Sequence, residues 1–137
     1  MINLIIINSL MNTEEVIKLI INKAYEVRSH FVAGYLESVY KKALLIELRE
    51  AGLIVEEEVE MPVTYKGHVI GVFRADIVVD KCVIIELKAV AQLLPAHAIQ
   101  LVNYLSVSGI DNGLLINFGS TERLEIKRKY RVYNLHN

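Results

Sequence analysis

The sequence predicts a single α/β domain in which two helices precede three strands, followed by a helix and two more strands. The length of 137 residues suits one hydrophobic core. Apolar residues recur at helical spacing in three segments, and β-branched residues form alternating or continuous runs in five others. Turn residues separate these segments, without a linker, repeat or low-complexity stretch. The order ααβββαββ therefore predicts an α/β fold.

The start of the chain differs in character from the rest. The first ten residues, MINLIIINSL, are apolar but too short to span a bilayer, and they lack the basic start of a signal peptide. Asn12 with Glu15 three residues later is a capping-box pattern, which marks a helix start. We therefore expect the domain to occupy residues 12–137. Residues 1–11 are then an extra segment, either an added strand or loose arm, or a stretch that precedes a native start at Met11.

The helices are predicted by apolar spacing and by their end signals. Residues 12–30 and 36–51 show helical spacing, and Gly52 provides a stop for the second helix. Pro95 fits the first turn of a third helix that ends near Gly109.

Five strands are predicted, over residues 54–65, 69–79, 82–89, 113–118 and 124–133. Pro62 indicates that the first strand lies at an edge or contains a bulge. Lys66-Gly67 and Asp80-Lys81 are expected to form tight turns between the first three strands. The apolar runs 77–79 and 83–85 are typical of strands in the centre of a covered sheet. Alternating apolar and basic residues indicate that the last strand is at an edge.

Composition excludes some classes of protein. The formal net charge is −1, so the chain has no overall positive field, which counts against a protein that coats DNA non-specifically. An enzyme with a local basic groove remains compatible with this charge. The single cysteine, Cys82, excludes a disulfide within the chain and a cysteine zinc cluster. We expect a cytoplasmic protein that does not associate with a membrane.

Three charged residues stand out in the apolar middle of the chain. Glu86 and Lys88 are two apart on one strand and therefore share a face, while Leu87 points the other way. Asp76 lies on the preceding strand, within cross-strand reach of Glu86. Burying such charges is unfavourable unless they are paired or used. The plain alternative is an ion pair of Lys88 with Asp76 or Glu86 at the margin of the sheet.

The same three residues have a coherent chemistry. Carboxylate oxygens of Asp76 and Glu86 suit Mg²⁺ or Mn²⁺, which keep several waters and bind phosphate oxygens. The backbone carbonyl of Leu87 is a further candidate ligand. A metal at this place polarises a scissile phosphate and lowers the pKa of a bound water. Lys88 would orient that water or neutralise charge that develops on the phosphate.

Asp76 followed by Glu86-Leu87-Lys88 resembles the signature of the PD-(D/E)XK nuclease superfamily. Gln100 and Tyr104, one helical turn apart, resemble the QxxxY motif of its exonuclease-like branch. This resemblance implies a restriction-endonuclease-like fold with a central mixed β-sheet flanked by helices, divalent metal ions, and a positioning role for Gln100.

More specifically, Gly34-Tyr-Leu-Glu37-Ser-Val-Tyr40 is similar to the motif that names the GxxExxY protein family. The similarity extends over about residues 13–130 and includes the segments Arg74-Ala-Asp76 and Gly113-Leu-Leu-Ile-Asn-Phe-Gly119. It implies that Glu37 is a third acidic residue near the metal. The alternative for Glu37 is a helix-start glutamate stabilised by the helix dipole.

A nuclease also needs groups that contact its substrate. Arg74 and the basic residues Lys127 and Arg128 of the last strand are the candidates for phosphate contacts, although charge runs are often solvated surface. Tyr40 and Tyr104 are candidates for stacking on a base, although tyrosines at helical spacing are often core residues.

These observations together predict a metal-dependent nuclease that hydrolyses phosphodiester bonds, with DNA as the expected substrate. One alternative is a catalytically silent module of the same fold that binds nucleic acid or protein. Another is hydrolysis of a different phosphate ester or nucleotide. Because the chain carries no added recognition domain, a homodimer or a protein partner is the expected means of targeting.

Overall fold

The computed structural model describes residues 11–133. The order of elements is ααβββαββ, as predicted from the sequence. The expected N-terminal strand or arm and the question of a start at Met11 concern residues 1–10, which lie outside the described residues, as do residues 134–137.

Three helices are present: α2 (Thr13–His30), α3 (Glu37–Glu50) and α4 (Pro95–Ser108). The capping box before α2 is confirmed. The backbone N–H of Glu15 donates to Asn12 Oδ1 at 2.9 Å, and the Asn12 N–H donates to Glu15 Oε1 at 3.4 Å. No helix within residues 11–133 is long and apolar enough to cross a membrane.

Five strands form one mixed sheet in the order β1-β2-β3-β4-β5. They are β1 (Val55–Tyr65), β2 (His68–Val79), β3 (Val83–Lys88), β4 (Asn112–Asn117) and β5 (Glu125–Tyr130). All neighbours are antiparallel except β3 and β4, which are parallel and joined through α4. Pro62 lies on the edge strand β1, where the missing N–H is tolerated.

The last strand is shorter than expected. It was predicted to continue to residue 133, but β5 ends at Tyr130, whose partner Asn112 is the first residue of β4. One further backbone bond, from the Arg131 N–H to the Asp111 carbonyl at 2.9 Å, follows before the pairing ends. A strand extends only as far as its neighbour can pair with it.

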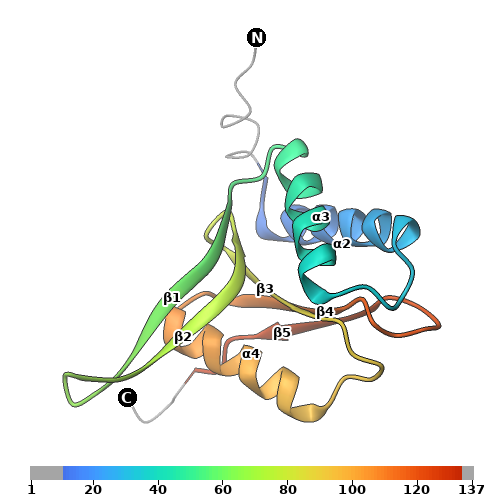
Figure 1. Cartoon of the computed structure of the whole chain (residues 1–137). Helices are drawn as coiled ribbons and strands as arrows, with labels where there is room; N and C mark the ends of the chain where they lie inside the picture. The colour runs from blue at the N-terminus through green and yellow to red at the C-terminus, as the bar shows by residue number, and fades with distance from the viewer. Residues whose placement is uncertain (1–10, 134–137) are drawn as a thin grey trace.

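The sheet is covered on both faces (Figure 1). α2 and α3 pack on one face over a large core that includes Ile20, Leu44, Ile85, Leu87 and Phe118. α4 packs on the other face over a smaller core that includes Ile84, Leu101, Tyr104, Leu105 and Leu115. Burial on both faces explains the near-continuous apolar runs of the central strands. The far part of the β1–β2 hairpin projects beyond the rest of the sheet (Figure 1).

Candidate active site

The site lies where β2 and β3 separate. Their backbone pairing covers three pairs only and ends at Ile77 opposite Ile85. At the next position, the carboxylates of Asp76 and Glu86 accept hydrogen bonds from backbone N–H groups, in place of backbone carbonyls. The Leu87 N–H donates to Asp76 Oδ2 at 2.9 Å, and the Asp76 N–H donates to Glu86 Oε1 at 3.2 Å. We call this place, defined by Asp76, Glu86 and Leu87, the strand fork.

The predicted alternation of β3 is confirmed. Ile85 and Leu87 belong to the core under α2 and α3. Glu86 and Lys88 therefore project from the opposite face, which is the face that α4 covers. Glu86 is only 4% exposed, whereas Asp76 and Lys88 are half-buried.

Burial strongly perturbs one of the carboxyl groups. The pKa of Glu86 is raised to about 8, first because the side chain is buried and second because the charge of Asp76 lies beside it. The backbone bond from Asp76 and the charge of Lys88 act in the opposite direction without prevailing. A carboxyl group whose ionised form is this strongly disfavoured is typical of functional sites.

The simple ion pair considered from the sequence is not formed. Within residues 11–133, Lys88 has no salt bridge with Asp76 or Glu86. The charge of Lys88 acts on Glu86 from a longer distance. The carboxylate pair thus stands beside a lysine that does not neutralise it by contact.

The donor set of the strand fork fits a hard divalent cation. Within residues 11–133 no group of three or more acidic, histidine or cysteine side chains is placed to hold a metal ion. Two carboxylates remain, and Mg²⁺ is commonly bound by one or two carboxylates with water filling the other positions. Because the Leu87 N–H faces Asp76, the Leu87 carbonyl faces the same edge of β3 and is available as a third oxygen.

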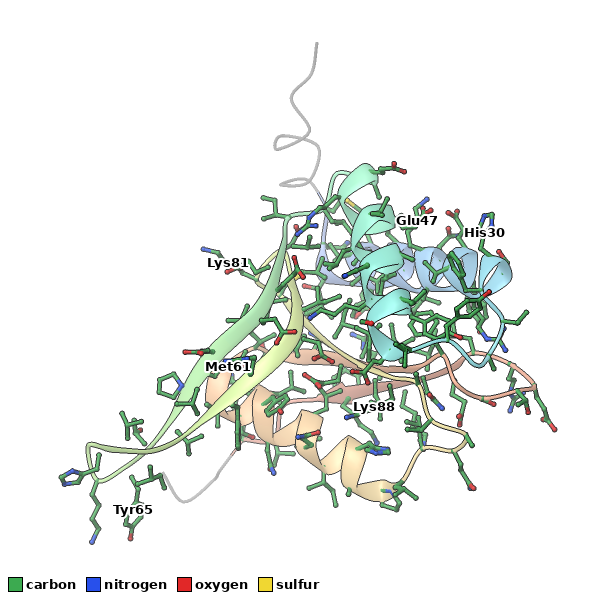
Figure 2. All side chains as sticks on the ribbon, viewed as in Figure 1. His30, Glu47, Met61, Tyr65, Lys81 and Lys88 are labelled. Carbon is green, nitrogen blue, oxygen red and sulfur yellow. The ribbon has the colours of Figure 1, made fainter. Side chains whose placement is uncertain are left out.

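Glu37 is the first residue of α3 and lies near the strand fork. Its pKa is raised by partial desolvation and then by the charge of Asp76, while Lys88 and Lys41 lower it. Much of the Glu37 side chain remains exposed. In Figure 2, Lys88 lies between the first turn of α3 and α4. Glu37 is thus close enough for the charges of Asp76 and Lys88 to change its pKa, but it is not part of the Asp76–Glu86 pair.

The predicted motif on α4 faces the same region. Tyr104 is 7% exposed and packs against the ring of Phe73, with 4.9 Å between ring centroids. Burial raises its pKa, and the charges of Glu86 and Asp76 raise it further, which places the phenol beside the carboxylates. Gln100 is one turn earlier on α4 and is exposed. Tyr104 has little surface left for a base, whereas Gln100 is accessible.

The structure does not support a substrate contact by Tyr40. Its side chain is fully buried and its ring stacks on Phe118, at 4.9 Å between centroids and an interplanar angle of 12°. The hydroxyl donates to the Val32 carbonyl and accepts from the Tyr35 N–H. Tyr40 therefore anchors the loop between α2 and α3, and through it the start of α3 at Glu37.

Arg74 is exposed on β2, two residues before Asp76, and contacts acidic residues of β1. Its guanidinium forms salt bridges with Glu60 at 3.0 Å and with Glu58 at 4.0 Å. Glu58 also pairs with Lys41 of α3. The acidic segment Glu56-Glu57-Glu58 of β1 is exposed, and these contacts offset part of its charge.

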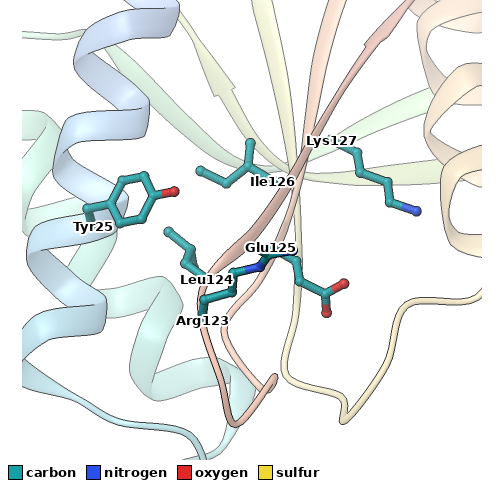
Figure 3. Close-up of a pocket in the computed structure, with 6 residues that line it drawn as sticks. All are labelled: Tyr25, Arg123, Leu124, Glu125, Ile126 and Lys127. Carbon is teal, nitrogen blue, oxygen red and sulfur yellow. The ribbon is translucent and has the colours of Figure 1, made fainter.

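The two basic residues of β5 have different surroundings. Arg128 donates to Glu14 of α2 at 2.7 Å and to Asn112 Oδ1 at 2.8 Å, on the face opposite to the strand fork. This does not fit the expected contact with nucleic acid, because its charge is already paired and it faces α2. Lys127 is exposed and points away from Tyr25 across β5 (Figure 3).

Lys127 also lines an open cavity of about 330 Å³ together with Tyr25, Arg123, Leu124, Glu125 and Ile126. β5 is three strand positions from β2, or roughly 14 Å at the usual spacing between strands. Lys127 and Arg123 therefore lie outside the strand fork, at the far edge of the sheet.

A protein-family model matches most of the chain. The model described as the PD-(D/E)XK nuclease superfamily matches residues 14–129, which include the strand fork, Lys88 and the motif on α4. The chain belongs to the PD-(D/E)XK nuclease superfamily.

Solved structures agree with this superfamily at the level of the fold. The crystal structure of SSO0001 matches with a TM-score of 0.55 and 22% identity over 71% of this chain and 50% of that chain. An alkaline exonuclease from Laribacter hongkongensis matches with a TM-score of 0.51 and 15% identity over 69% of this chain and 56% of that chain. The PD-(D/E)XK chain thus spans about half the length of these relatives. No curated protein matches the sequence.

Proposed function

We propose that this chain is a metal-dependent nuclease that hydrolyses phosphodiester bonds in DNA. The observation that carries the proposal is the strand fork, where a buried and a half-buried carboxylate meet beside a lysine that pairs with neither. Asp76 and Glu86 would hold Mg²⁺ or Mn²⁺, with the Leu87 carbonyl as a further ligand. Membership of the PD-(D/E)XK superfamily supports this assignment.

Each group has a role that follows from its position. The bound metal supplies Lewis acidity toward the phosphate and lowers the pKa of its water. Lys88 orients the attacking water or neutralises charge on the phosphate, because its ammonium is not occupied by a carboxylate. Glu37 lies at the rim and is suited to hold a water, and Gln100 is exposed on α4 and is suited to position the substrate.

The proposed substrate path starts at the strand fork. Lys127 and Arg123 offer phosphate contacts along β5, and Arg74 offers one on β2 if a phosphate displaces its acidic partners. We assign the chain to the GxxExxY branch of the superfamily on the motif at Gly34, Glu37 and Tyr40. A homodimer or a protein partner would supply the targeting of the nuclease to its substrate.

The test is a cleavage panel over single-stranded, double-stranded and branched DNA and RNA, with Mg²⁺, with Mn²⁺ and with EDTA. The wild type is expected to cleave at least one DNA form only when a metal is present. Lys88→Ala should abolish the cleavage while circular dichroism and the unfolding midpoint show an intact fold.

Lys18→Ala is the matched control, because Lys18 is an exposed lysine of α2, on the other face of the sheet. It should cleave as the wild type does. A wild type that is as inert as Lys88→Ala on every substrate would contradict the proposal and favour a silent module that binds nucleic acid or protein.

A further inference from the structure

Asn117 is the one polar residue in the apolar run that forms the end of β4, and it is completely buried. In the parallel pairing of β3 and β4, its partner is Lys88. A buried amide is unfavourable unless its two donor hydrogens and its acceptor oxygen are all satisfied. The bonds that Asn117 makes therefore indicate what it does.

All of the bonding capacity of Asn117 is used, and half of it goes to one residue. Oδ1 accepts from the Val90 N–H at 3.0 Å, and Nδ2 donates to the Val90 carbonyl at 2.9 Å. The second lone pair of Oδ1 accepts from the Gly119 N–H at 3.0 Å, and the second hydrogen of Nδ2 goes to Glu125 at 2.8 Å. A single side chain thus holds both backbone polar groups of Val90, as a neighbouring strand would.

Two further contacts fix the same segment. The Phe118 N–H donates to the Lys88 carbonyl at 2.9 Å. Gly119 lies against the Ala89–Val90 peptide so closely that a Cβ atom would come within 2.4 Å of it. The backbone from Lys88 to Val90 is therefore held on three successive residues by residues 117–119, just where β3 ends.

Lys88 needs such support because its own side chain lacks a salt bridge within residues 11–133. The Leu87 N–H is fixed by Asp76 on one side. Asn117 and its neighbours fix the backbone on the other side. The part of Lys88 that the structure holds in place is therefore its backbone, from which the side chain starts.

We propose that Asn117 is a positioning residue that holds the exit of β3 and thereby aims Lys88 at the strand fork. This proposal rests on the nuclease function proposed for Lys88. Removal of the amide should release Val90 and let Lys88 move, while Asp76 and Glu86 keep their own mutual bonds. The chemical step should suffer more than the binding of metal or substrate.

The test compares Asn117→Ala with the wild type in three independent measurements: NMR, steady-state cleavage and metal titration. Selective ¹⁵N labelling of lysine, with Lys88→Arg to assign its signal, reports the environment of the Lys88 ammonium by NMR, and uniform ¹⁵N labelling reports amide exchange at Val90. Steady-state cleavage reports kcat and KM, and Mn²⁺ titration reports the dissociation constant. We expect a shifted Lys88 signal, faster amide exchange at Val90, and kcat lower by about 10- to 100-fold with KM and metal affinity within about threefold.

Asn112→Ala is the matched control, because Asn112 is the other asparagine of β4 and bonds to Arg128 at the opposite end of the strand. It should leave the Lys88 signal and kcat unchanged. Asn117→Ser, which places a smaller polar group, a hydroxyl, at the site of the amide, replaces Asn117→Ala if the latter does not fold.

Faster exchange at Val90 with an unchanged Lys88 signal and unchanged kcat would overturn the proposal, because Asn117 would then only stabilise the loop. If the wild type cleaves nothing, the proposed nuclease function fails. The Lys88 signal then decides the positioning role by itself: a shift supports the role and an unchanged signal overturns it.

Discussion

Glu86 shows how one residue links burial to chemistry. A buried carboxyl group beside Asp76 favours its protonated form, so its pKa rises from an ordinary 4.5 to about 8. A divalent cation at the strand fork would replace that proton and stabilise both carboxylates in their charged form. The metal-free protein and the metal-bound protein should therefore differ in how they respond to pH.

The pH dependence of stability tests this directly. Between pH 4.5 and about 8, the folded metal-free protein holds a proton on Glu86 that the unfolded chain has lost. The contribution of Glu86 to the free energy of unfolding is therefore full below pH 4.5 and is lost as the pH rises through about 8. Urea denaturation in EDTA at several pH values should show this loss, and Glu86→Gln should reduce it.

Metal should oppose the same loss. At pH 8, Mn²⁺ binds the folded state and should raise the unfolding midpoint of the wild type but not of Asp76→Ala.

Parallel pH curves of the free energy of unfolding for the wild type and Glu86→Gln in EDTA would contradict the account of Glu86.

At the scale of elements, local signals were predictable from the sequence and the strand fork was not. The capping box at Asn12, the turn at Lys66-Gly67 and the stop at Gly109 each depend on residues next to one another in the chain. The position at which β2 and β3 stop pairing depends instead on both strands together. The residue pattern of a single strand does not reveal it. The sequence predicts that Asp76 and Glu86 lie within reach of each other across two strands. It does not predict the hydrogen bonds that their carboxylates accept from backbone N–H groups.

Tyr40 anchors the loop between α2 and α3, whereas the sequence made it a candidate for stacking on a base. Tyr40→Phe removes the hydroxyl that satisfies Val32 and Tyr35 while keeping the stacked ring. Loss of this part-buried hydrogen bond should reduce the free energy of unfolding by about 0.5–1.5 kcal/mol. Urea denaturation measures this effect.

Tyr35→Phe is the control for that prediction, because the Tyr35 side chain is 48% exposed. Its effect should be within about 0.5 kcal/mol. Equal effects of the two substitutions would show that the Tyr40 hydroxyl does not anchor the loop.

For the whole molecule, the two cores on either side of one sheet should unfold together. Leu44 lies in the core under α2 and α3, and Leu101 lies in the core under α4, both without exposed surface. Replacing either with alanine should reduce the free energy of unfolding by about 2–5 kcal/mol. Tyrosine fluorescence and circular dichroism should report a single transition in both variants.

Ile46→Ala is the control, since Ile46 is 57% exposed on α3. It should change the free energy of unfolding by no more than about 0.5 kcal/mol. Two separated transitions in Leu101→Ala would contradict the view that both faces of the sheet form one cooperative unit.

Contacts between distant parts of the chain limited what the sequence could predict about the site. Arg128 was a candidate for a phosphate contact because it lies in a basic run, but it pairs with Glu14, 114 positions earlier. Tyr40 was a candidate for stacking on a base, with a core position as the alternative, and its ring closes the core against Phe118. Charge and motif identify a residue's chemistry, whereas its partners emerge only from the tertiary arrangement.

The central claim is that Asp76 and Glu86 at the strand fork form a divalent metal site. Calorimetric titration of Mn²⁺ into the wild type and into Asp76→Ala at pH 8 tests this claim most directly. The account predicts one binding event per chain in the wild type and its loss, or a weakening of at least about 10-fold, in Asp76→Ala. No binding to the wild type, or equal binding to both proteins, would contradict it.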